Sequence, residues 1–352
     1  MSTPWLLYGA NGYTGELIAR EAVARGMRPI LAGRSKQKIA RLAAELNCPS
    51  AVFELDDHTA LVSTLTQVSA VLHCAGPFSR TARSMMQGCL ATHVHYLDIT
   101  GEIDVFELAH SVHEKAQRAG VVICPGVGFD VVPTDSVAAR LKEALPDATH
   151  LALGFDSRAG SSKGTAKTAI ESAGRGSCIR VDGNLVTEKL ASRTRRIDFG
   201  GGEKVAISIP WGDVSTAYYT TGIGNIEVYT AASQKSLDKM RRANWFRPLL
   251  RQRWIRELAK FSAERRVTPP DRTQRENNPS YVWGEARNAA GEVKTARLRT
   301  ANGYSLTVQS SLGILGELLS RACNPGFTTP SLLVGADFVS TLPGSSPIRI
   351  DA

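Results

Sequence analysis

Three glycines spaced three residues apart stand near the start of the chain, between a short apolar run and a segment of helical periodicity. Gly9, Gly12 and Gly15 follow residues 5–8 and precede residues 16–24. In a strand–turn–helix unit the first glycine allows a sharp turn, the second lets a pyrophosphate approach the backbone, and the third lets helix and strand pack closely. The N–H groups at the helix start would bind the diphosphate. A plain glycine-rich turn is the alternative.

The residues after the second expected strand, residues 27–33, indicate which dinucleotide is bound. Arg34 and Ser35 stand where an acidic residue would hold the ribose 2′-hydroxyl of NAD(H). A guanidinium at this position suits a 2′-phosphate, and Lys38 is close enough in sequence to assist. We therefore predict NADP(H) as the cofactor. The alternative is a solvated arginine that opens a helix over residues 36–46.

Acidic residues in the later glycine-bearing segments are candidates for proton transfer. Asp130 follows Gly128 and is our first candidate for a catalytic group that contacts the substrate or the nicotinamide. An equally weighted alternative is that it caps a helix over residues 131–145. Asp98 and Glu102 flank a glycine turn, where a structural hydrogen-bonding role is favoured for both.

A second candidate loop covers residues 160–165, ahead of a helix that begins near residue 166. Lys163 and Thr165 are the candidate catalytic residues there, because such a loop could bind an anion or a carbonyl oxygen. An ordinary surface loop is the alternative. The loop is not a P-loop, because it lacks the glycine spacing and the Gly-Lys-Ser/Thr sequence.

Histidine and cysteine placement bears on metal binding and redox state. The seven histidines include no helical i,i+4 pair with an acid as third ligand, so we predict no metal site. The six cysteines are scattered and form no CxxC pair. That placement indicates reduced thiols rather than a disulfide framework or a zinc site.

The elements that must position these residues alternate between strand and helix through residue 130. Apolar runs at residues 50–56, 69–74, 94–98 and 121–124 are typical of strands. The alternation predicts an α/β, Rossmann-type domain with a doubly wound parallel sheet, whose carboxyl edge binds ligands. The predicted cofactor-binding residues lie in the loops at that edge: Gly9, Asn11, Gly12, Tyr13, Thr14, Gly15, Arg34, Ser35, Cys74, Ala75, Gly76, Pro77, Phe78, Asp98, Gly128 and Phe129.

From residue 150 the pattern changes to strands bounded by turns, including a hairpin whose turn lies at residues 288–291. The sequence therefore predicts a second α+β domain with a mostly antiparallel sheet. We expect residues 1–148 to form the cofactor domain and residues 149–304 to form a substrate and dimerisation domain. Helices within residues 305–352 are expected to pack back on the first domain.

The net charge of +9 is concentrated in one segment. Residues 239–266 contain ten Lys/Arg and two Glu, interspersed with Trp245, Leu249 and Trp254. One interpretation is an amphipathic helix that lays its apolar stripe on its own domain. The other is a docking surface for an acidic acyl carrier protein or for an anionic membrane. Nucleic acid is not expected, because no recognised module accompanies the basic segment.

Composition predicts a soluble, cytoplasmic protein. A hydrophobic content of 43% and a charged content of 21% are ordinary for a globular chain. No apolar run approaches the length of a membrane span, and the chain enters its first strand without a basic-then-apolar leader, so no signal peptide is expected. The oligomeric state is left open, with a homodimer among the alternatives.

Five loops, in order, resemble those of the saccharopine dehydrogenase-like oxidoreductases. They are residues 8–15, 32–35, 74–78, 96–102, and 128–130 with 133–135. Within that superfamily the chain is most similar to the trans-acting enoyl reductase and saccharopine dehydrogenase-like branch. The resemblance implies NADP-dependent hydride transfer, with the substrate bound between the two domains. A short-chain dehydrogenase is disfavoured, because no Tyr is followed by a Lys four residues later.

The activity that we expect is NADPH-dependent reduction of an activated C=C bond, such as an enoyl group on a carrier-bound or lipid-like small-molecule substrate. Reduction of C=N, or the reverse oxidation of a secondary amine, is the alternative of the saccharopine dehydrogenase type. It would require carboxylate-binding arginines, for which Arg158 and Arg175 are candidates. A third alternative is a non-catalytic NADP-binding scaffold whose basic helix docks on a membrane or a partner.

Overall fold

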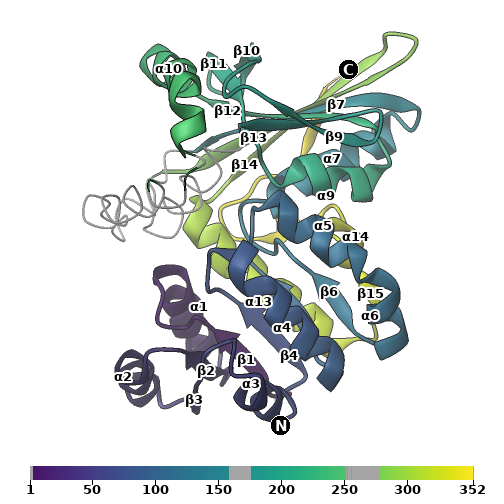
Figure 1. Ribbon diagram of the computed structural model, residues 1–352. Helices are drawn as coiled ribbons and strands as arrows, with labels where there is room; N and C mark the ends of the chain where they lie inside the picture. The colour runs from purple at the N-terminus through teal and green to yellow at the C-terminus, as the bar shows by residue number, and fades with distance from the viewer. Residues whose placement is uncertain (1–2, 158–175, 251, 253–254, 256–277, 352) are drawn as a thin grey trace. The chain divides into compact units, whose positions relative to one another are not determined.

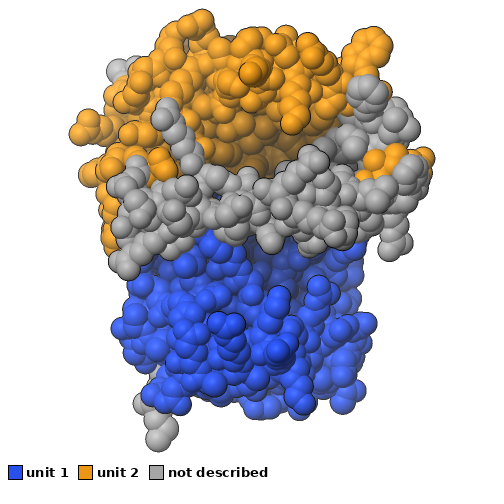
Figure 2. All heavy atoms as spheres, turned by 90° about the vertical axis from the view of Figure 1, so that its left-hand side faces the viewer, with its two compact units in different colours: residues 1–130, 306–334 blue, residues 131–305, 335–352 orange. Residues whose placement is uncertain are grey.

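The computed structural model describes residues 3–157, 176–250, 252, 255 and 278–351, without the side chains of residues 246–250. The chain divides into two compact units (Figure 2). Unit 1 comprises residues 1–130 and 306–334, and unit 2 comprises residues 131–305 and 335–352. Every helix in the described ranges is too short or too polar to cross a bilayer.

Unit 1 is built on a seven-stranded parallel sheet with the strand order β15-β6-β5-β4-β1-β2-β3 (Figure 1). The chain order reverses between β1 and β4, and this switch point is where a doubly wound sheet forms its ligand crevice. The predicted doubly wound parallel sheet is confirmed. The strands are β1 (Trp5–Tyr8), β2 (Ile30–Gly33), β3 (Ser50–Val52), β4 (Ala70–His73), β5 (His95–Asp98), β6 (Val122–Cys124) and β15 (Gly326–Phe327).

Helices cover this sheet, so its central strands are apolar along their whole length. All four residues of β1 and of β4 are buried, as expected for strands covered on both faces. Leu61, Met85 and Val105 pack from three helices into the same core cluster as Val71 and Tyr96 of the sheet. The helices are α1 (Tyr13–Ala24), α2 (Lys36–Leu46), α3 (His58–Leu65), α4 (Phe78–Thr92), α5 (Ile103–Ser111), α6 (His113–Ala119), α13 (Gly303–Ser320) and α14 (Pro330–Val334).

Unit 2 is built on a nine-stranded sheet with the path β10-β11-β12-β7-β13-β14-β16, to which β8 and β9 add through β12. The β7–β12 pair is parallel and the other described pairs are antiparallel, so the predicted second α+β domain with a mostly antiparallel sheet is confirmed. The strands are β7 (Ala148–Ser157), β8 (Ser177–Val181), β9 (Asn184–Glu188), β10 (Thr194–Asp198), β11 (Glu203–Ser208), β12 (Asn225–Ala231), β13 (Ser280–Asn288), β14 (Val293–Thr300) and β16 (Arg349–Asp351). The helices are α7 (Val132–Ala144), α9 (Asp213–Thr221), α10 (Gln234–Leu250) and α15 (Phe338–Thr341).

The sheet of unit 2 curls over its own face. Arg195 on β10 forms an ion pair with Glu285 on β13, although three strands separate β10 from β13 in the sheet. A flat sheet would place these strands roughly 19 Å apart, beyond the reach of the two side chains. The enclosed face holds a small core that includes Phe199, Tyr229 and Trp283.

The division of the chain differs from the predicted boundary at residue 148. α7 belongs to unit 2, because it packs closely on β13: a Cβ on Gly284 would lie 2.6 Å from Val137 Cγ1 and 2.8 Å from Leu141 Cδ1. The C-terminal region is divided as well. Residues 306–334 join unit 1 through α13 and the β15–β6 pair, whereas residues 335–352 join unit 2 through the β16–β14 pair.

Candidate functional site

The turn after β1 brings the ends of three strands together. The N–H groups of Gly9 and Ala10 both donate to Ala32 O on β2, at 2.8 and 3.1 Å. Gly9 has φ +84°, and a Cβ there would lie 2.8 Å from Ala75 N in the loop after β4. A Cβ on Gly15 would lie 2.3 Å from Gly9 O. Position 9 therefore requires glycine for its backbone conformation, and position 15 requires it for the packing of α1 on the turn.

The N-terminus of α1 follows this turn at the switch point of the sheet. Its N-cap, Gly12, is extended and has no side chain with which to cap the helix. Peptide N–H groups and the partial positive charge at such a terminus attract phosphate. Asn11 Oδ1 lies 2.7 Å from the position of a Cβ on Gly33, which places Asn11 against the end of β2, and Tyr13 and Thr14 form the first turn of α1. The arrangement fits the diphosphate of a dinucleotide.

A second anion-binding arrangement follows β2. Arg34 is exposed and forms no hydrogen bond or ion pair with the residues that the structure describes. Ser35 is the N-cap of α2, and its hydroxyl makes no capping hydrogen bond. Burial raises the pKa of Tyr8 at the end of β1 to about 12, and Arg34 opposes that shift, so the guanidinium lies within electrostatic reach of β1. The guanidinium, the hydroxyl and the helix terminus together fit a phosphate beside the first turn.

The loop after β4 is held against the first turn by backbone hydrogen bonds. Cys74 N donates to Tyr8 O at 2.8 Å, and the Gly76–Pro77 peptide is cis. Thr81 Oγ1 in α4 donates to Ala75 O at 2.7 Å. Four of the predicted cofactor-binding residues, Cys74 to Pro77, therefore lie beside the glycine turn at the carboxyl edge of the sheet.

A buried histidine, His73, contacts this loop through the hydroxyl group of Thr81. His73 Nε2 lies 2.9 Å from Thr81 Oγ1. Because that hydroxyl donates its proton to Ala75 O, the imidazole must be the donor, which assigns the Nε2–H tautomer. Burial lowers the pKa of His73 to about 3, so the ring is neutral at physiological pH. It packs among aromatic rings, with centroids 5.5 Å from Tyr8 and 5.4 Å from Phe78.

Asp98 is one of the predicted cofactor-binding residues, and its contacts fit the structural role that the sequence favours for it. Its side chain is fully buried, and its two oxygens accept hydrogen bonds from Tyr96 Oη at 2.6 Å and from Thr100 N and Gly126 N at 2.9 Å each. Burial raises the pKa of Asp98 to about 6, against the lowering effect of these hydrogen bonds. Asp98 therefore connects the loops after β5 and β6 through its hydrogen bonds, which is the structural role that the sequence favours for it.

Glu102 and Asp130 form a pair of acidic residues at the same edge. Glu102 accepts hydrogen bonds from Phe78 N at 2.8 Å and Ser79 N at 2.9 Å, so its carboxylate caps α4. Asp130 lies against Gly101, where a Cβ would be 2.8 Å from Asp130 Oδ2. Burial, and after it the charge of Glu102, raises the pKa of Asp130 to about 7. In the alternative role considered for it, as a helix cap, Asp130 would act from the position just before Val131, the N-cap of α7.

The loop that carries Gly128 and Phe129 is fixed by α13, a contact that sequence reasoning missed. Thr307 Oγ1 accepts from Phe129 N at 2.9 Å, and Ser310 Oγ donates to Val127 O at 2.7 Å. A Cβ on Gly128 would lie 3.0 Å from Thr307 Cγ2. Because Gly128 has no side chain, α13 can pack closely against this loop. That contact fixes the position of Gly128 and Phe129, the two residues that precede Asp130.

Lys163 and Thr165 lie outside the described residues. In the described part of the chain, no group of three or more His, Cys, Asp or Glu side chains is arranged to hold a metal ion.

Comparison with known proteins agrees with this geometry. Residues 5–124 match the family model of the saccharopine dehydrogenase NADP binding domain. The chain carries a saccharopine dehydrogenase NADP-binding domain. Its cofactor is NADP(H), as predicted from Arg34, and the predicted resemblance to saccharopine dehydrogenase-like oxidoreductases is confirmed.

Relatives match part of the chain. The saccharopine dehydrogenase-like oxidoreductase of Bos taurus is 28% identical over 150 residues, covering 37% of this chain and 35% of that protein. A Mycobacterium tuberculosis protein named as a trans-acting enoyl reductase is 32% identical over 157 residues, covering 40% of this chain and 36% of that protein. The chain thus spans about a third of the length of these relatives.

One solved structure shares the fold over the whole chain. The apo saccharopine dehydrogenase (L-Glu forming) of Saccharomyces cerevisiae is similar with a TM-score of 0.65 at 10% identity, covering 99% of this chain and 100% of that one. At this identity the similarity concerns the fold, and it includes the second unit that the domain match leaves out.

Proposed function

We propose that the protein is an NADPH-dependent reductase in which Asp130 supplies the proton that accompanies hydride transfer. One observation carries the proposal: a carboxyl group with a pKa of about 7 lies at the carboxyl edge of the NADP-binding sheet. A group that titrates near neutral pH is suited to general acid catalysis. Asp98, the other acid with a raised pKa in this region, has no exposed surface.

We further propose an activated C=C bond as the group reduced, on a carrier-bound or lipid-like substrate. Bound NADPH supplies the hydride. The protein must hold the acceptor, stabilise the negative charge that develops on the conjugated carbonyl oxygen, and protonate the α-carbon. Asp130 is assigned the last of these tasks. The trans-acting enoyl reductases among the relatives support this choice of substrate.

Reduction of a C=N bond is the second candidate, and the fold shared with saccharopine dehydrogenase favours it. In that reaction Asp130 would protonate the imine nitrogen. The arginines that could bind the carboxylates of such a substrate, Arg158 and Arg175, lie outside the described residues. The same acid therefore serves either reaction, and the substrate has to be found by assay.

The experiment measures NADPH oxidation by the wild type and by Asp130→Asn with two substrate panels: pantetheine enoyl thioesters, and imines formed from 2-oxo acids and amino acids. We expect turnover of enoyl thioesters, and a fall in kcat of roughly 100-fold or more in the variant because amide nitrogen does not donate a proton to carbon. NADPH affinity should be unchanged. Asp104→Asn, an exposed carboxylate of α5, is the matched control and should behave as wild type.

Each outcome has a distinct consequence. Turnover of imines alone would replace the C=C proposal with the C=N candidate. Tight NADPH binding with no turnover of either panel would favour a non-catalytic scaffold. Full activity of Asp130→Asn would refute the assignment of the proton donor.

A further inference from the structure

An exposed tryptophan on α10 lies outside the reductase site. Trp245 has 86% of its surface exposed, the largest exposed fraction among the large hydrophobic side chains of the described residues. The opposite face of α10 is fixed to unit 2: Leu237 is buried, and Asn244 exchanges hydrogen bonds with Leu190 N at 2.8 Å and Leu190 O at 3.0 Å. Trp245 is therefore not part of an apolar stripe that packs on the protein.

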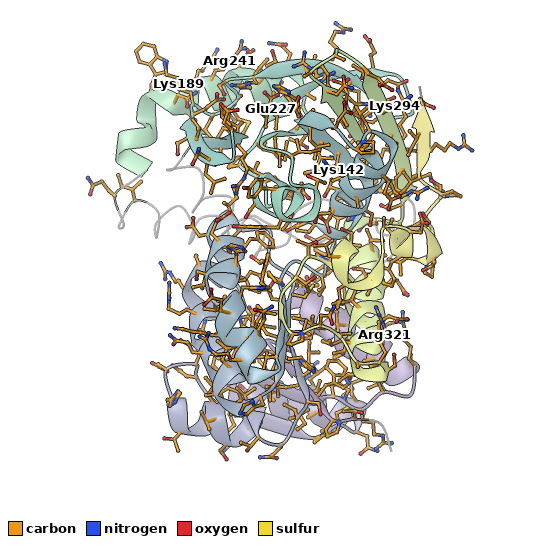
Figure 3. The ribbon with its side chains drawn as sticks, turned by 90° about the vertical axis from the view of Figure 1, so that its right-hand side faces the viewer. Lys142, Lys189, Glu227, Arg241, Lys294 and Arg321 are labelled. Carbon is orange, nitrogen blue, oxygen red and sulfur yellow. The ribbon has the colours of Figure 1, made fainter. Side chains whose placement is uncertain are left out.

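Positive charge surrounds this indole. A helical period of 3.6 residues places Trp245 on the same exposed half of α10 as four cations, and Lys189 precedes the residue that Asn244 holds. We define the α10 patch as Lys189, Lys235, Lys239, Arg241, Arg242 and Trp245, all of them exposed. Arg241 and Lys189 extend outward at the same end of unit 2 (Figure 3).

The five cations of the α10 patch form no ion pair with the side chains that the structure describes. The carboxylate on the same helix face, Asp238, accepts a hydrogen bond from Gln234 Nε2 at 3.1 Å. Five positive groups thus face one negative group, and residues 239–266 as a whole contain ten Lys/Arg against two Glu. Both the local and the longer-range charge favour an anionic partner.

We propose that the α10 patch docks the protein on an anionic lipid bilayer. Stable attachment to a membrane without a spanning helix requires two contributions, insertion of apolar surface and attraction to anionic headgroups. The indole supplies the first, because its amphipathic ring is suited to the headgroup boundary. The five cations supply the second through long side chains that reach lipid phosphates. This proposal is independent of the reaction proposed above.

An acidic protein is the competing partner, and the charge alone would suit it. Trp245 favours the bilayer, because an indole with 86% of its surface exposed needs a complementary pocket on a protein but only an interface on a membrane. The two partners are separated by experiment.

The test is co-sedimentation of the full chain with two kinds of vesicle, phosphatidylcholine alone and phosphatidylcholine mixed with phosphatidylserine. We expect binding to the mixed vesicles only, weakened by added salt. Arg241→Gln with Arg242→Gln should weaken binding roughly 30-fold, from the typical contribution of two cations near an anionic surface. Trp245→Ala should weaken it roughly tenfold, and the indole emission lost in that variant should be the component that shifts to the blue on binding.

Matched controls change the same chemistry elsewhere. Lys115→Gln with Arg118→Gln removes two exposed cations from α6, and Leu332→Ala truncates an apolar side chain that is 57% exposed on α14. Both should bind as wild type. The proposal is overturned if the wild type does not bind the mixed vesicles, or if it binds an acidic acyl carrier protein but no vesicle. It is also overturned if the double arginine variant and Trp245→Ala both bind the vesicles as strongly as the controls.

Discussion

Glu102 acts on the proposed proton donor through charge, and its removal should therefore move a pH profile rather than abolish activity. Asp130 is active as an acid when protonated, so turnover falls as pH rises through its pKa. The charge of Glu102 is the second cause, after burial, of the raised pKa. In Glu102→Gln the pKa of Asp130 should fall, and the alkaline loss of kcat should begin at lower pH.

The control for this prediction is Glu114→Gln, an exposed carboxylate of α6. It should leave the pH profile in place. A profile of Glu102→Gln that coincides with the wild type, at reduced kcat, would indicate that Glu102 only caps α4 and that its charge does not influence the reacting acid.

Arg34 should determine the preference for the phosphorylated cofactor. Its guanidinium is exposed and unpaired among the described residues, so a 2′-phosphate meets no competing partner there. Arg34→Ala should weaken NADPH binding by roughly 1.5–3 kcal/mol, the cost of a hydrogen bond to a charged group, and should leave NADH binding unchanged. Fluorescence titration with both nucleotides measures this. Arg41→Ala, which removes an exposed cation from the following helix α2, should affect neither. Equal losses for the two nucleotides in Arg34→Ala would contradict the assignment.

The role of a residue can be predicted from the sequence when it depends on neighbours in the chain. It cannot be predicted when the contacting residue is far away in the sequence. Gly9, Gly15 and Arg34 are recognisable because strand, turn and helix are contiguous. The N–H of Gly126, which donates to Asp98 from 28 residues away, gives no local signal in the sequence. The contact between Thr307 and Phe129 spans 178 residues and gives no local signal.

Among the elements, the junction of β1 and α1 depends most strictly on a single atom. A Cβ on Gly15 would lie 2.3 Å from Gly9 O, a backbone atom that cannot rotate away. Gly15→Ala should therefore displace α1 from the turn, destabilise the protein by about 1–3 kcal/mol, and reduce NADPH affinity more than tenfold. Urea unfolding and NADPH titration measure the two effects.

Gly316→Ala is the matched control for that substitution. Gly316 lies within α13 and has nothing within 4 Å of its added Cβ. Alanine there should stabilise the protein by about 0.5–1 kcal/mol, because it restricts the unfolded chain and suits a helix. Wild-type stability and affinity in Gly15→Ala would show that the turn can relax and that the close approach is not required.

Helices and strands could be predicted where the local sequence pattern favours the same structure as the packing in the folded protein. The apolar runs became β1 to β6, and the turn at residues 288–291 joins β13 to β14 as expected. α9 was not predicted, because its sequence DVSTAYYTT is rich in residues that favour strands; its first five residues are buried, so packing decides its structure. The curl of the second sheet brings together Arg195 and Glu285, which are 90 residues apart and give no local signal of it.

For the molecule as a whole, the change at residue 150 from helix alternation to antiparallel pattern located the second sheet but not the boundary of its unit. α7 continues the strand–helix alternation in sequence and was therefore assigned to the first domain. Its apolar face meets Gly284 of β13, and that contact places it in unit 2. A boundary drawn from local pattern follows the order of elements, whereas a compact unit follows the partners that bury them.

Stability against acid should depend on His73, the neutral histidine beneath the cofactor loop. Burial lowers the pKa of His73 to about 3 from an ordinary 6.5. Between these two pH values the imidazole binds a proton in the unfolded chain but not in the folded chain. Its contribution to stability is therefore complete above pH 6.5 and is lost as pH falls toward 3, by about 1.4 kcal/mol per pH unit. Asp98 and Asp130 act in the opposite direction, because their raised pKa values let the folded state bind protons first.

The variant His73→Leu isolates this contribution, since the two acids act equally in both proteins. Loss of the hydrogen bond to Thr81 should make the variant about 1 kcal/mol less stable near pH 8. Near pH 4.5 the wild type has lost about 3 kcal/mol through His73 and the variant none, so the variant should be the more stable by about 2 kcal/mol. Urea unfolding of both proteins at the two pH values measures this change in which protein is the more stable. Stability curves that run parallel would mean that the imidazole reaches solvent and titrates normally in the folded protein.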